Sequence, residues 1–428
     1  MIKRSRIDRR TFVVLLLAGC ADVSRPPPLT PTTPLPQPIP PTGTSPPPTG
    51  YLSFDEWRAA YRAKALGEGI PAAVLERELA GLSPNTQVET LDGKQPEFSK
   101  PVSDYLKSAV SDARIAEGRG YRDSLTFLGA LEQQYGVPRE LVLAIWAMET
   151  NFGKIRGDFD VIRSLATLAW EGRRRSWAEG ELTAALRILA RGEAGRSQLR
   201  GSWAGAMGHT QFMPSVFLST AVDGDGDGAR DIWNSAQDAL ASTFNYLAKA
   251  GWRRGESWAE EVVLPADFDY ALAETEKKTP AGWEALGVRR AGGLPWTSAD
   301  AAAEAHLLLP AGANGPAILA FPNHYAIRRY NNSVSYALAV GMLADRFAGE
   351  SGLTAAWPYE VALSLSARQQ AQRDLTKLGF DTGGADGIIG PNSRKALRAW
   401  QVSRGLPADA YLTTAIISRL RTEAGSVP

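Results

Sequence analysis

Cysteine and histidine are almost absent from this chain. It has one cysteine, Cys20, and three scattered histidines, His209, His306 and His324, among 428 residues. A single cysteine cannot form a disulfide within a monomer. Three separated histidines give little support to a His-rich zinc site or to a Ser-His-Asp triad. The chemistry of this chain therefore has to come from other side chains.

The chain also lacks an excess of charge of either sign. Its formal net charge is +1, but five basic residues and one acidic residue lie within 1–19. Without that segment 42 basic and 45 acidic residues remain, a net charge near −3. This balance does not indicate nucleic acid as a partner, nor an anionic membrane surface bound through charge.

A short apolar run lies close to the N-terminus. Basic residues precede the apolar stretch 12–17, and the letters LAGC follow and end at Cys20. This pattern is typical of a signal peptide with a lipoprotein cleavage box, and it is shorter than the ~20 apolar residues of a membrane-spanning helix. We expect 1–19 to be removed and Cys20 to be lipidated, with an incidental thiol as the alternative. By analogy with bacterial lipoproteins, Ala21 permits transfer to the outer membrane.

Residues 24–50 are dominated by proline, with threonine, serine and glycine. Such a composition cannot bury a core and favours extended polyproline II. At ~3.1 Å per residue the segment could reach up to ~80 Å. We therefore expect 20–50 to be a tether between a lipid anchor and a folded unit.

Helical spacing of apolar residues begins at residue 54 and predicts a mainly α (α+β) fold. The helices that we expect cover 54–66, 105–115, 124–135, 138–153, 161–169, 180–191 and 236–250. Residues 252–329 differ, because three short apolar runs, 261–264, 305–309 and 317–321, predict strands between Pro- and Gly-rich turns. We expect this β-rich segment to interrupt an α-helical unit that spans 51–349.

Glu149 is the candidate catalytic residue. It lies near the end of the predicted helix 138–153, and helical spacing places it on the same stripe as Val142, Ile145 and Trp146. Desolvation and the negative end of the helix dipole both predict a raised carboxyl pKa. A proton held near neutral pH can be donated. The alternative is a helix-end glutamate whose carboxylate reaches water.

Two further stretches complete a pattern. Residues 201–214 have the sequence GSWAGAMGHTQFMP, in which three glycines allow close backbone approach beside polar and aromatic side chains, and 330–338 have the sequence YNNSVSYAL. Together with the Glu149-Thr150 pair, these stretches resemble the membrane-bound lytic transglycosylase B family, which cleaves peptidoglycan. The resemblance covers roughly 54–347 and implies a lysozyme-like catalytic domain.

The resemblance implies a mechanism with one carboxyl group. Glu149 would protonate the glycosidic oxygen between N-acetylmuramic acid and N-acetylglucosamine, then take the proton of the muramoyl C6 hydroxyl, so that a 1,6-anhydro sugar forms. It also implies substrate contacts through hydrogen-bonding side chains and groove-lining tyrosines: Ser202, Gln211, Asn331, Tyr246, Tyr330 and Tyr336. Phe212 and Met213 are expected to shape the wall of the groove.

Two other functions remain open from the sequence. A hydrolytic muramidase would use the same acid with water as acceptor, and Asp158 or Asp160 would be its base. A non-catalytic scaffold would grip glycan without turnover. Mass analysis of released products distinguishes all three, since the scaffold releases nothing and the muramidase leaves reducing ends.

An acidic loop follows the second stretch. Residues 223–234 have the sequence DGDGDGARDIWN, with carboxylates at alternate positions and glycine at the sixth, like the opening of a calcium loop. The twelfth position holds Asn234 in place of glutamate. A calcium site here would use residues at the ligand positions, with Asp238 as a substitute: Asp223, Asp225, Asp227, Ala229, Asp231 and Asp238. The alternative is a solvated acidic turn, and no cofactor is required for the chemistry.

After a linker, 350–362, the segment 363–421 resembles the small three-helix peptidoglycan-binding domain. The resemblance rests on 371–380, on the letters DGIIGPNS at 386–393 and on 396–401. The segment 363–421 has no histidine, so we do not expect the zinc site that some relatives have. This domain would raise the effective concentration of the enzyme at the wall. We expect a monomer in the periplasm that binds glycan strands and no nucleic acid.

Overall fold

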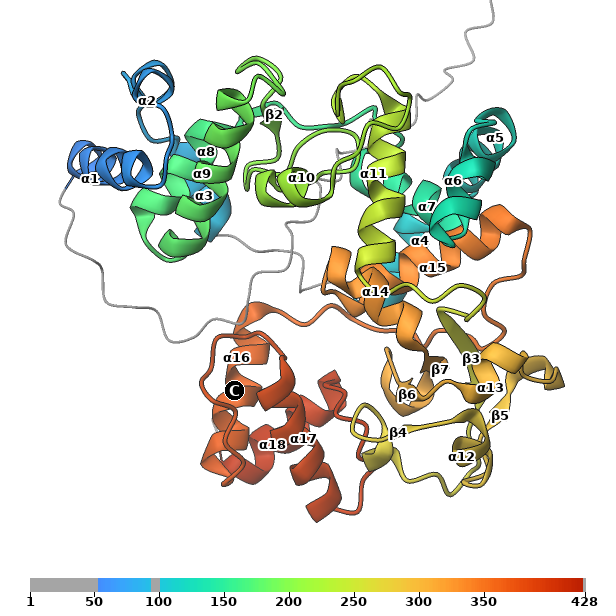
Figure 1. The fold of residues 1–428 in the computed structure, drawn as a ribbon. Coiled ribbons are helices and arrows are strands. Elements are labelled where there is room, and N and C mark those ends of the chain that lie inside the picture. Colours follow the sequence, from blue (N-terminus) through green and yellow to red (C-terminus); the bar gives the residue numbers. More distant parts are fainter. Residues whose placement is uncertain (1–52, 94–100, 426–428) are drawn as a thin grey trace, which may run out of the picture. The chain divides into compact units, whose positions relative to one another are not determined.

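Helices make up most of the chain, and a small five-stranded sheet accompanies them (Figure 1). The structure is a computed structural model that describes residues 53–93 and 101–425. Cys20, the signal peptide 1–19 and the Pro-rich tether lie outside the described residues. The fold is therefore mainly α with a small antiparallel sheet, as the sequence predicts.

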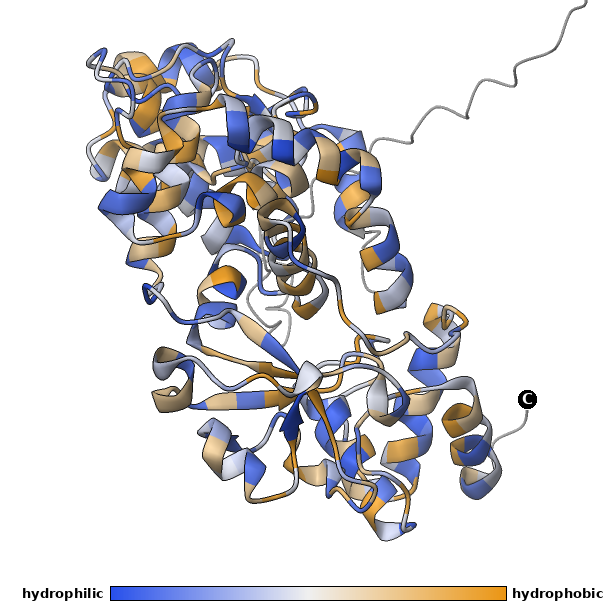
Figure 2. Cartoon of the chain, turned by 90° about the vertical axis from the view of Figure 1, so that its right-hand side faces the viewer, coloured by the Kyte–Doolittle hydropathy of each residue, from blue (hydrophilic) through white to orange (hydrophobic). Residues whose placement is uncertain are grey.

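Eighteen α-helices lie within the described residues. They are α1 (Phe54–Gly67), α2 (Ala72–Leu79), α3 (Thr86–Gly93), α4 (Val102–Ala109), α5 (Asp112–Ser124), α6 (Leu128–Tyr135), α7 (Arg139–Thr150), α8 (Val161–Glu171), α9 (Arg175–Ala190), α10 (Pro214–Thr220), α11 (Ala236–Lys249), α12 (Pro280–Glu284), α13 (Ser298–Ala302), α14 (Pro322–Tyr330), α15 (Val334–Ala348), α16 (Leu365–Lys377), α17 (Pro391–Ser403) and α18 (Thr414–Ala424). Hydrophobic and hydrophilic bands alternate along most of them in Figure 2, as amphipathic packing requires.

Helix α7 is central to the largest hydrophobic core. Its residues from Leu141 to Ala147 are all buried, and it packs against α15, α5, α6 and α11. A helix that is apolar on every side needs neighbours on every side. This packing holds the end of α7, which carries Glu149, inside the fold.

Three predicted helix boundaries are wrong. The expected helix 105–115 is two helices, because Val110 leaves the helical conformation and the Ser111 side chain caps α5 by accepting from Arg114 N. The expected helix 124–135 begins only at Leu128, and α9 begins at Arg175 instead of residue 180. A serine that can cap was the signal that apolar spacing alone missed.

The strands fall where the short apolar runs predict them. The sheet has the order β4-β6-β7-β3-β5 and is antiparallel throughout. Its strands are β3 (Ala259–Val263), β4 (Lys277–Lys278), β5 (Arg289–Arg290), β6 (Ala305–Leu308) and β7 (Ala317–Ala320), while β1 (Phe159–Asp160) and β2 (Arg200–Gly201) pair separately. The five-stranded sheet has a hydrophobic core of its own, in which Trp283 and Phe321 are fully buried.

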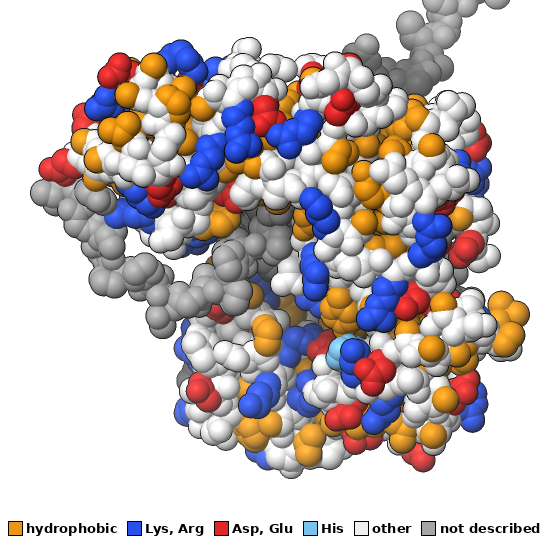
Figure 3. All heavy atoms as spheres, viewed as in Figure 1, with side chains coloured by type: hydrophobic (Ala, Val, Ile, Leu, Met, Phe, Trp, Pro, Cys, Tyr) orange, Lys and Arg blue, Asp and Glu red, His pale blue; other side chains and the backbone are white. Residues whose placement is uncertain are grey.

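The C-terminal helices α16, α17 and α18 enclose a third core. Trp400, Leu397 and Leu375 are buried in it, and Arg368 donates to the carbonyl of Gly387 beneath α16. Within the described residues, no helix combines the length and apolarity needed to cross a bilayer. On the face drawn in Figure 3, basic and acidic side chains are interspersed.

Candidate active site around Glu149

Glu149 is a buried acid in the last turn of α7. Its side chain is 5% exposed, and its Oε1 accepts a hydrogen bond of 2.6 Å from the Tyr336 hydroxyl on α15. Burial raises the pKa of Glu149 to about 8, although the bond from Tyr336 acts in the opposite direction. The raised pKa that the apolar stripe predicts is confirmed.

The end of α7 is fixed by an unusual backbone. The helix stops at Thr150, short of the expected Gly153, because Asn151 and Phe152 both adopt positive φ, 49° and 60°. The Thr150 hydroxyl accepts from Gly153 N at 2.9 Å and donates to the carbonyl of His209. Thr150 therefore joins the end of the catalytic helix to the loop 201–214.

The loop 201–214 is folded tightly onto itself. Ser202 N donates to Ala206 O at 2.8 Å, and Ala206 N donates to Ser202 Oγ at 3.0 Å. A Cβ on Gly201 would stand 1.8 Å from Ala206 O, so only glycine fits there. The Ser202 hydroxyl accepts within the loop and keeps its proton to donate.

Gln211 presents an unused acceptor. This residue is 1% exposed, and its backbone has a positive φ of 54°, a conformation that residues other than glycine rarely adopt. Its amide nitrogen donates to Arg156 O at 3.1 Å and to Gly208 O at 3.0 Å. Its Oε1 is buried with no hydrogen-bond partner among the described residues. Both donors are thus used, and the acceptor has no partner in the described part of the chain.

Two of the three tyrosines, Tyr330 and Tyr336, lie deeper than the resemblance implies, whereas Tyr246 is partly buried. Tyr330 and Tyr336 are buried, and the hydroxyls of Tyr330 and Tyr246 donate to the carbonyls of Thr210 and Arg329. Tyr330 and Tyr246 contact each other edge to face, with ring centroids 4.9 Å apart. In the structure, these hydroxyls already have protein acceptors, and the Tyr336 hydroxyl serves Glu149.

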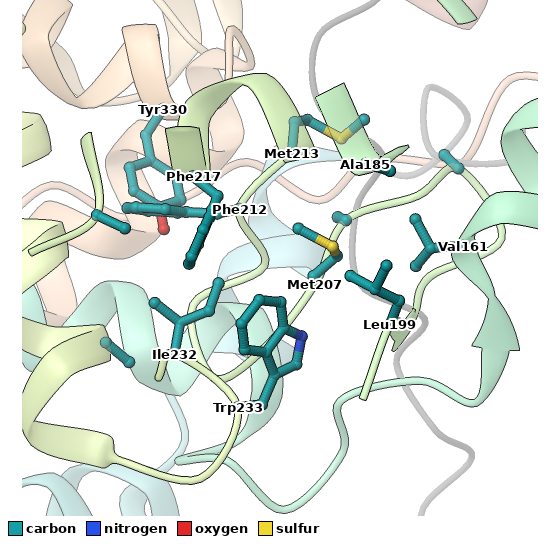
Figure 4. Packing of buried hydrophobic residues seen from close by; sticks show 14 of the residues in the cluster. Val161, Ala185, Leu199, Met207, Phe212, Met213, Phe217, Ile232, Trp233 and Tyr330 are labelled. Carbon is teal, nitrogen blue, oxygen red and sulfur yellow. The ribbon is translucent and has the colours of Figure 1, made fainter. Parts of the chain in front are cut away.

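Two other expected wall residues are in the core. Asn331 follows the last residue of α14 and is mostly buried. Phe212 and Met213 point inward beside Met207, and Figure 4 shows Phe212 next to Tyr330. Phe212 and Met213 therefore do not line the surface of a groove, because both are buried in the core.

Tyr105, on α4, is a neighbour of Glu149 that the sequence did not indicate. Burial, followed by the charge of Glu149, raises the pKa of its hydroxyl. That hydroxyl is buried without a hydrogen-bond partner in the described part of the chain. Tyr105 belongs to none of the three sequence stretches, and no spacing rule connects α4 to α7. Only the packing of α15 against both helices brings it to the site.

Two carboxylates are candidates for the base of a hydrolytic reaction, Asp158 and Asp160. One is exposed, and the other is engaged in hydrogen bonds away from Glu149. Asp160 caps α8 by accepting from Arg163 N, and its two oxygens accept from Nε and Nη2 of Arg196. Asp158 is exposed in the loop before β1. Asp160 is therefore a partly buried helix cap, held in hydrogen bonds to Arg163 and Arg196.

Four carboxylates of the acidic loop converge. One oxygen from each lies within 4.8 Å of the others, in Asp223, Asp225, Asp227 and Asp238. Asp238 is buried at the start of α11, and its two oxygens accept from Gly224 N and from Asp231 N. Asp238, the substitute that the sequence suggests, therefore lies beside the other three carboxylates.

Asp231 is not part of this group. Its carboxylate accepts from Trp233 N and from Asn234 Nδ2 at 2.9 and 2.8 Å, which caps the following turn. Ala229 lies in the same loop, and its N–H donates to Asp227. The structure thus brings together four of the five carboxylates that the sequence proposes as ligands.

Comparison with known proteins agrees with this architecture. A family model for the transglycosylase SLT domain matches residues 53–345, and one for a peptidoglycan-binding domain matches 364–420. Membrane-bound lytic murein transglycosylase B of Escherichia coli (strain K12) is 33% identical over 279 residues, which cover 62% of this chain and 72% of that protein.

Solved structures give the same result. SltB3 from Pseudomonas aeruginosa, in complex with NAG-anhNAM-pentapeptide, is 49% identical, with a TM-score of 0.82 over 87% of this chain and 100% of that chain. Escherichia coli lytic transglycosylase Slt35, in complex with calcium, is 30% identical, with a TM-score of 0.59 over 68% of this chain and 92% of that chain. The chain therefore belongs to the SLT-domain transglycosylase family, and it is a lytic transglycosylase that acts on peptidoglycan.

Proposed function

We propose that Glu149 alone carries the acid and base steps of this lytic reaction. As a neutral acid it protonates the oxygen between N-acetylmuramic acid and N-acetylglucosamine, and the bond from C1 to that oxygen breaks. The acetamido oxygen of the substrate stabilises the positive anomeric centre. Glu149, now ionised, removes the proton of the C6 hydroxyl, whose oxygen bonds to C1. The product is a 1,6-anhydro sugar, and no water is consumed.

The observation that carries this proposal is the environment of Glu149. A carboxyl group with a pKa of about 8 is protonated before the reaction at neutral pH. The hydrogen bond from Tyr336 favours the ionised form that appears after the first step. Burial and the phenol thus support opposite stages of the cycle, so one residue can serve both.

Three polar side chains are proposed to hold the sugar. The buried Gln211 Oε1, which has no partner among the described residues, accepts from a sugar hydroxyl or acetamido N–H. The Ser202 hydroxyl donates its remaining proton, and Asn331 contributes from the end of α14. Tyr246, Tyr330 and Tyr336 then act behind this layer, where they fix the loop and the acid.

The test is the mass of the products formed in water labelled with oxygen-18. The proposed route predicts muropeptides that are one water lighter than reducing-end sugars and carry no label. Labelled reducing ends would mean hydrolysis instead. The chain from Tyr51 onward is suitable, because it retains all the hydrophobic cores of the described residues.

We also propose a structural calcium ion in the acidic loop. Carboxylate oxygens are the donors that calcium prefers, and Asp223, Asp225, Asp227 and Asp238 offer four within one small volume. The relative Slt35 was solved with calcium, which supports the proposal. Such an ion would hold the loop between α10 and α11, and the chemistry at Glu149 does not need it.

We further propose that the enzyme works in the periplasm on a lipid anchor at Cys20, in the outer membrane. The lipoprotein box and the Pro-rich tether support this location, and the E. coli relative is a membrane-bound enzyme. We propose that the protein acts as a monomer. Metabolic labelling with a radioactive fatty acid tests the anchor, since Cys20→Ser should abolish incorporation.

A further inference from the structure

The C-terminal helices carry a surface hollow that lies outside the site around Glu149. It has a volume of about 400 Å³ and is lined by one face of α16 and by the loop that follows: Arg373, Thr376, Lys377, Asp381, Gly384 and Ala385. The hollow is open to solvent, and the charged side chains of Arg373, Lys377 and Asp381 at its rim are exposed. Two cations and one carboxylate thus surround one hollow.

Ion pairs do not neutralise these charges within the described residues. There, neither Arg373 nor Lys377 forms an ion pair, and Arg373 bonds only to the side chain of Gln370. Asp381 accepts a hydrogen bond from Gly383 N and from no other described residue. By contrast, four other cations of this region do form ion pairs: Arg394, Arg398, Arg404 and Arg419.

The rim of the hollow has a defined shape. Thr382 Oγ1 donates to Gly384 O at 2.7 Å and contacts Thr376 Oγ1 at 3.2 Å, so the loop is held against α16. Gly383 and Gly384 have φ of 73° and 131°, conformations that residues with a Cβ rarely adopt. The charged groups are therefore presented from a folded wall.

We propose that this hollow binds the peptide stems of peptidoglycan. A stem carries carboxylates, which suit the guanidinium of Arg373 and the ammonium of Lys377, and its diamino acid carries an amine, which suits Asp381. Residues 364–420 hold eight basic and four acidic side chains, so the segment as a whole attracts acidic peptides. The inference deepens the proposed function, on which its choice of ligand rests.

The test is binding of the Glu149→Gln protein to purified sacculi, because this variant leaves the polymer intact. Two ligands are compared, intact sacculi and the stem-free glycan strands that an amidase releases from them. We expect stem removal to weaken binding about fivefold, as for the loss of one or two charge-assisted contacts. Lys377→Glu should weaken binding to intact sacculi to the same extent and leave no further effect of stem removal.

Lys395→Glu is the matched control. Lys395 is exposed on α17, does not line the hollow, and forms no ion pair in the described part of the chain, so this change alters the net charge equally. It should leave both the affinity and the effect of stem removal intact. The thermal unfolding midpoint of each variant checks that the fold persists.

Three outcomes would overturn the inference. They are equal losses in Lys377→Glu and Lys395→Glu, an equal loss by Lys377→Glu on intact sacculi and on stem-free strands, or wild-type binding that is unchanged by stem removal. The proposed function is judged separately, by the products of the protein with Glu149. Failure to release anhydro sugars would reject that function and leave a measured stem dependence standing.

Discussion

The hydroxyl of Tyr336 donates a 2.6 Å hydrogen bond to Oε1 of Glu149, across 187 residues of sequence. The bond joins α15 to the end of α7 inside the largest core. It stabilises the carboxylate form of an acid that burial otherwise keeps protonated. The pair therefore sets the protonation balance on which the proposed acid and base steps depend.

Tyr336→Phe should slow the enzyme and move its pH profile. Because the lost bond lowers the pKa of Glu149, the variant has a higher pKa, and the alkaline limb of kcat/KM shifts to higher pH. Loss of a bond to a charged group costs about 1.5–3 kcal/mol, or roughly ten- to a hundredfold in kcat. Turnover of sacculi measured from pH 5 to 10 gives both quantities.

Tyr61→Phe is the control for this prediction. Tyr61 lies on α1, which does not contribute to the site, and its buried hydroxyl forms a hydrogen bond with the hydroxyl of Thr183. The control should change the stability of the protein without moving the alkaline limb of kcat/KM. If this limb also stays in place in Tyr336→Phe, the Tyr336 hydroxyl does not affect the pKa of Glu149.

Glu149→Gln should be more stable than the wild type at alkaline pH. Folding raises the pKa of Glu149 from 4.5 to about 8, so the stabilising contribution of the protonated form is full below pH 4.5 and declines as the pH rises toward 8. Glutamine does not titrate and can still accept from Tyr336. We expect a gain of about 4 kcal/mol at pH 8 and a much smaller difference at pH 4.5.

Thermal or urea unfolding at these two pH values measures the difference. Asp345 also has a pKa raised by burial, to about 7, but it is present in both proteins and cancels in the comparison. An equal difference at both pH values would mean that Glu149 is not held protonated by the fold.

The sequence predicted the acid better than its surroundings. Apolar spacing within one helix was enough to bury Glu149, because neighbours three and four residues apart determine that face. Tyr105 and the inward direction of Phe212 depend on contacts between distant elements, which no local period encodes. The capping serine Ser111 was visible in the sequence, but apolar spacing overrode it. The roles of the tyrosine hydroxyls could not be assigned either, since their acceptors lie on distant elements: the carbonyls of Thr210 and Arg329 and the carboxylate of Glu149.

Gly201→Ala should disrupt the loop of the site. A Cβ at this position would lie 1.8 Å from Ala206 O, so the turn that holds Ser202 has to open. We expect a loss of about 3 kcal/mol or more in the free energy of unfolding, and a large loss of activity. Gly180→Ala is the control, because a Cβ there meets nothing within 4 Å in α9, and it should stabilise by up to ~1 kcal/mol. A Gly201→Ala protein of normal stability would contradict the geometry.

Calcium should raise the unfolding midpoint, and the rise should depend on the four converging carboxylates. Binding to the folded state stabilises it by an amount that grows with free calcium, and a chelator should reverse the effect. Asp223→Asn should abolish the response, while Asp231→Asn should retain it, because an asparagine at 231 can still cap the turn. A wild-type midpoint that is identical in calcium and in chelator would reject the site.

The most direct test of the one-carboxyl mechanism is mass spectrometry of the muropeptides that the wild type, Glu149→Gln and Asp158→Asn release from sacculi. The account predicts anhydro products from the wild type and from Asp158→Asn, and none from Glu149→Gln. Anhydro products that persist in Glu149→Gln, or reducing-end products that depend on Asp158, would contradict it.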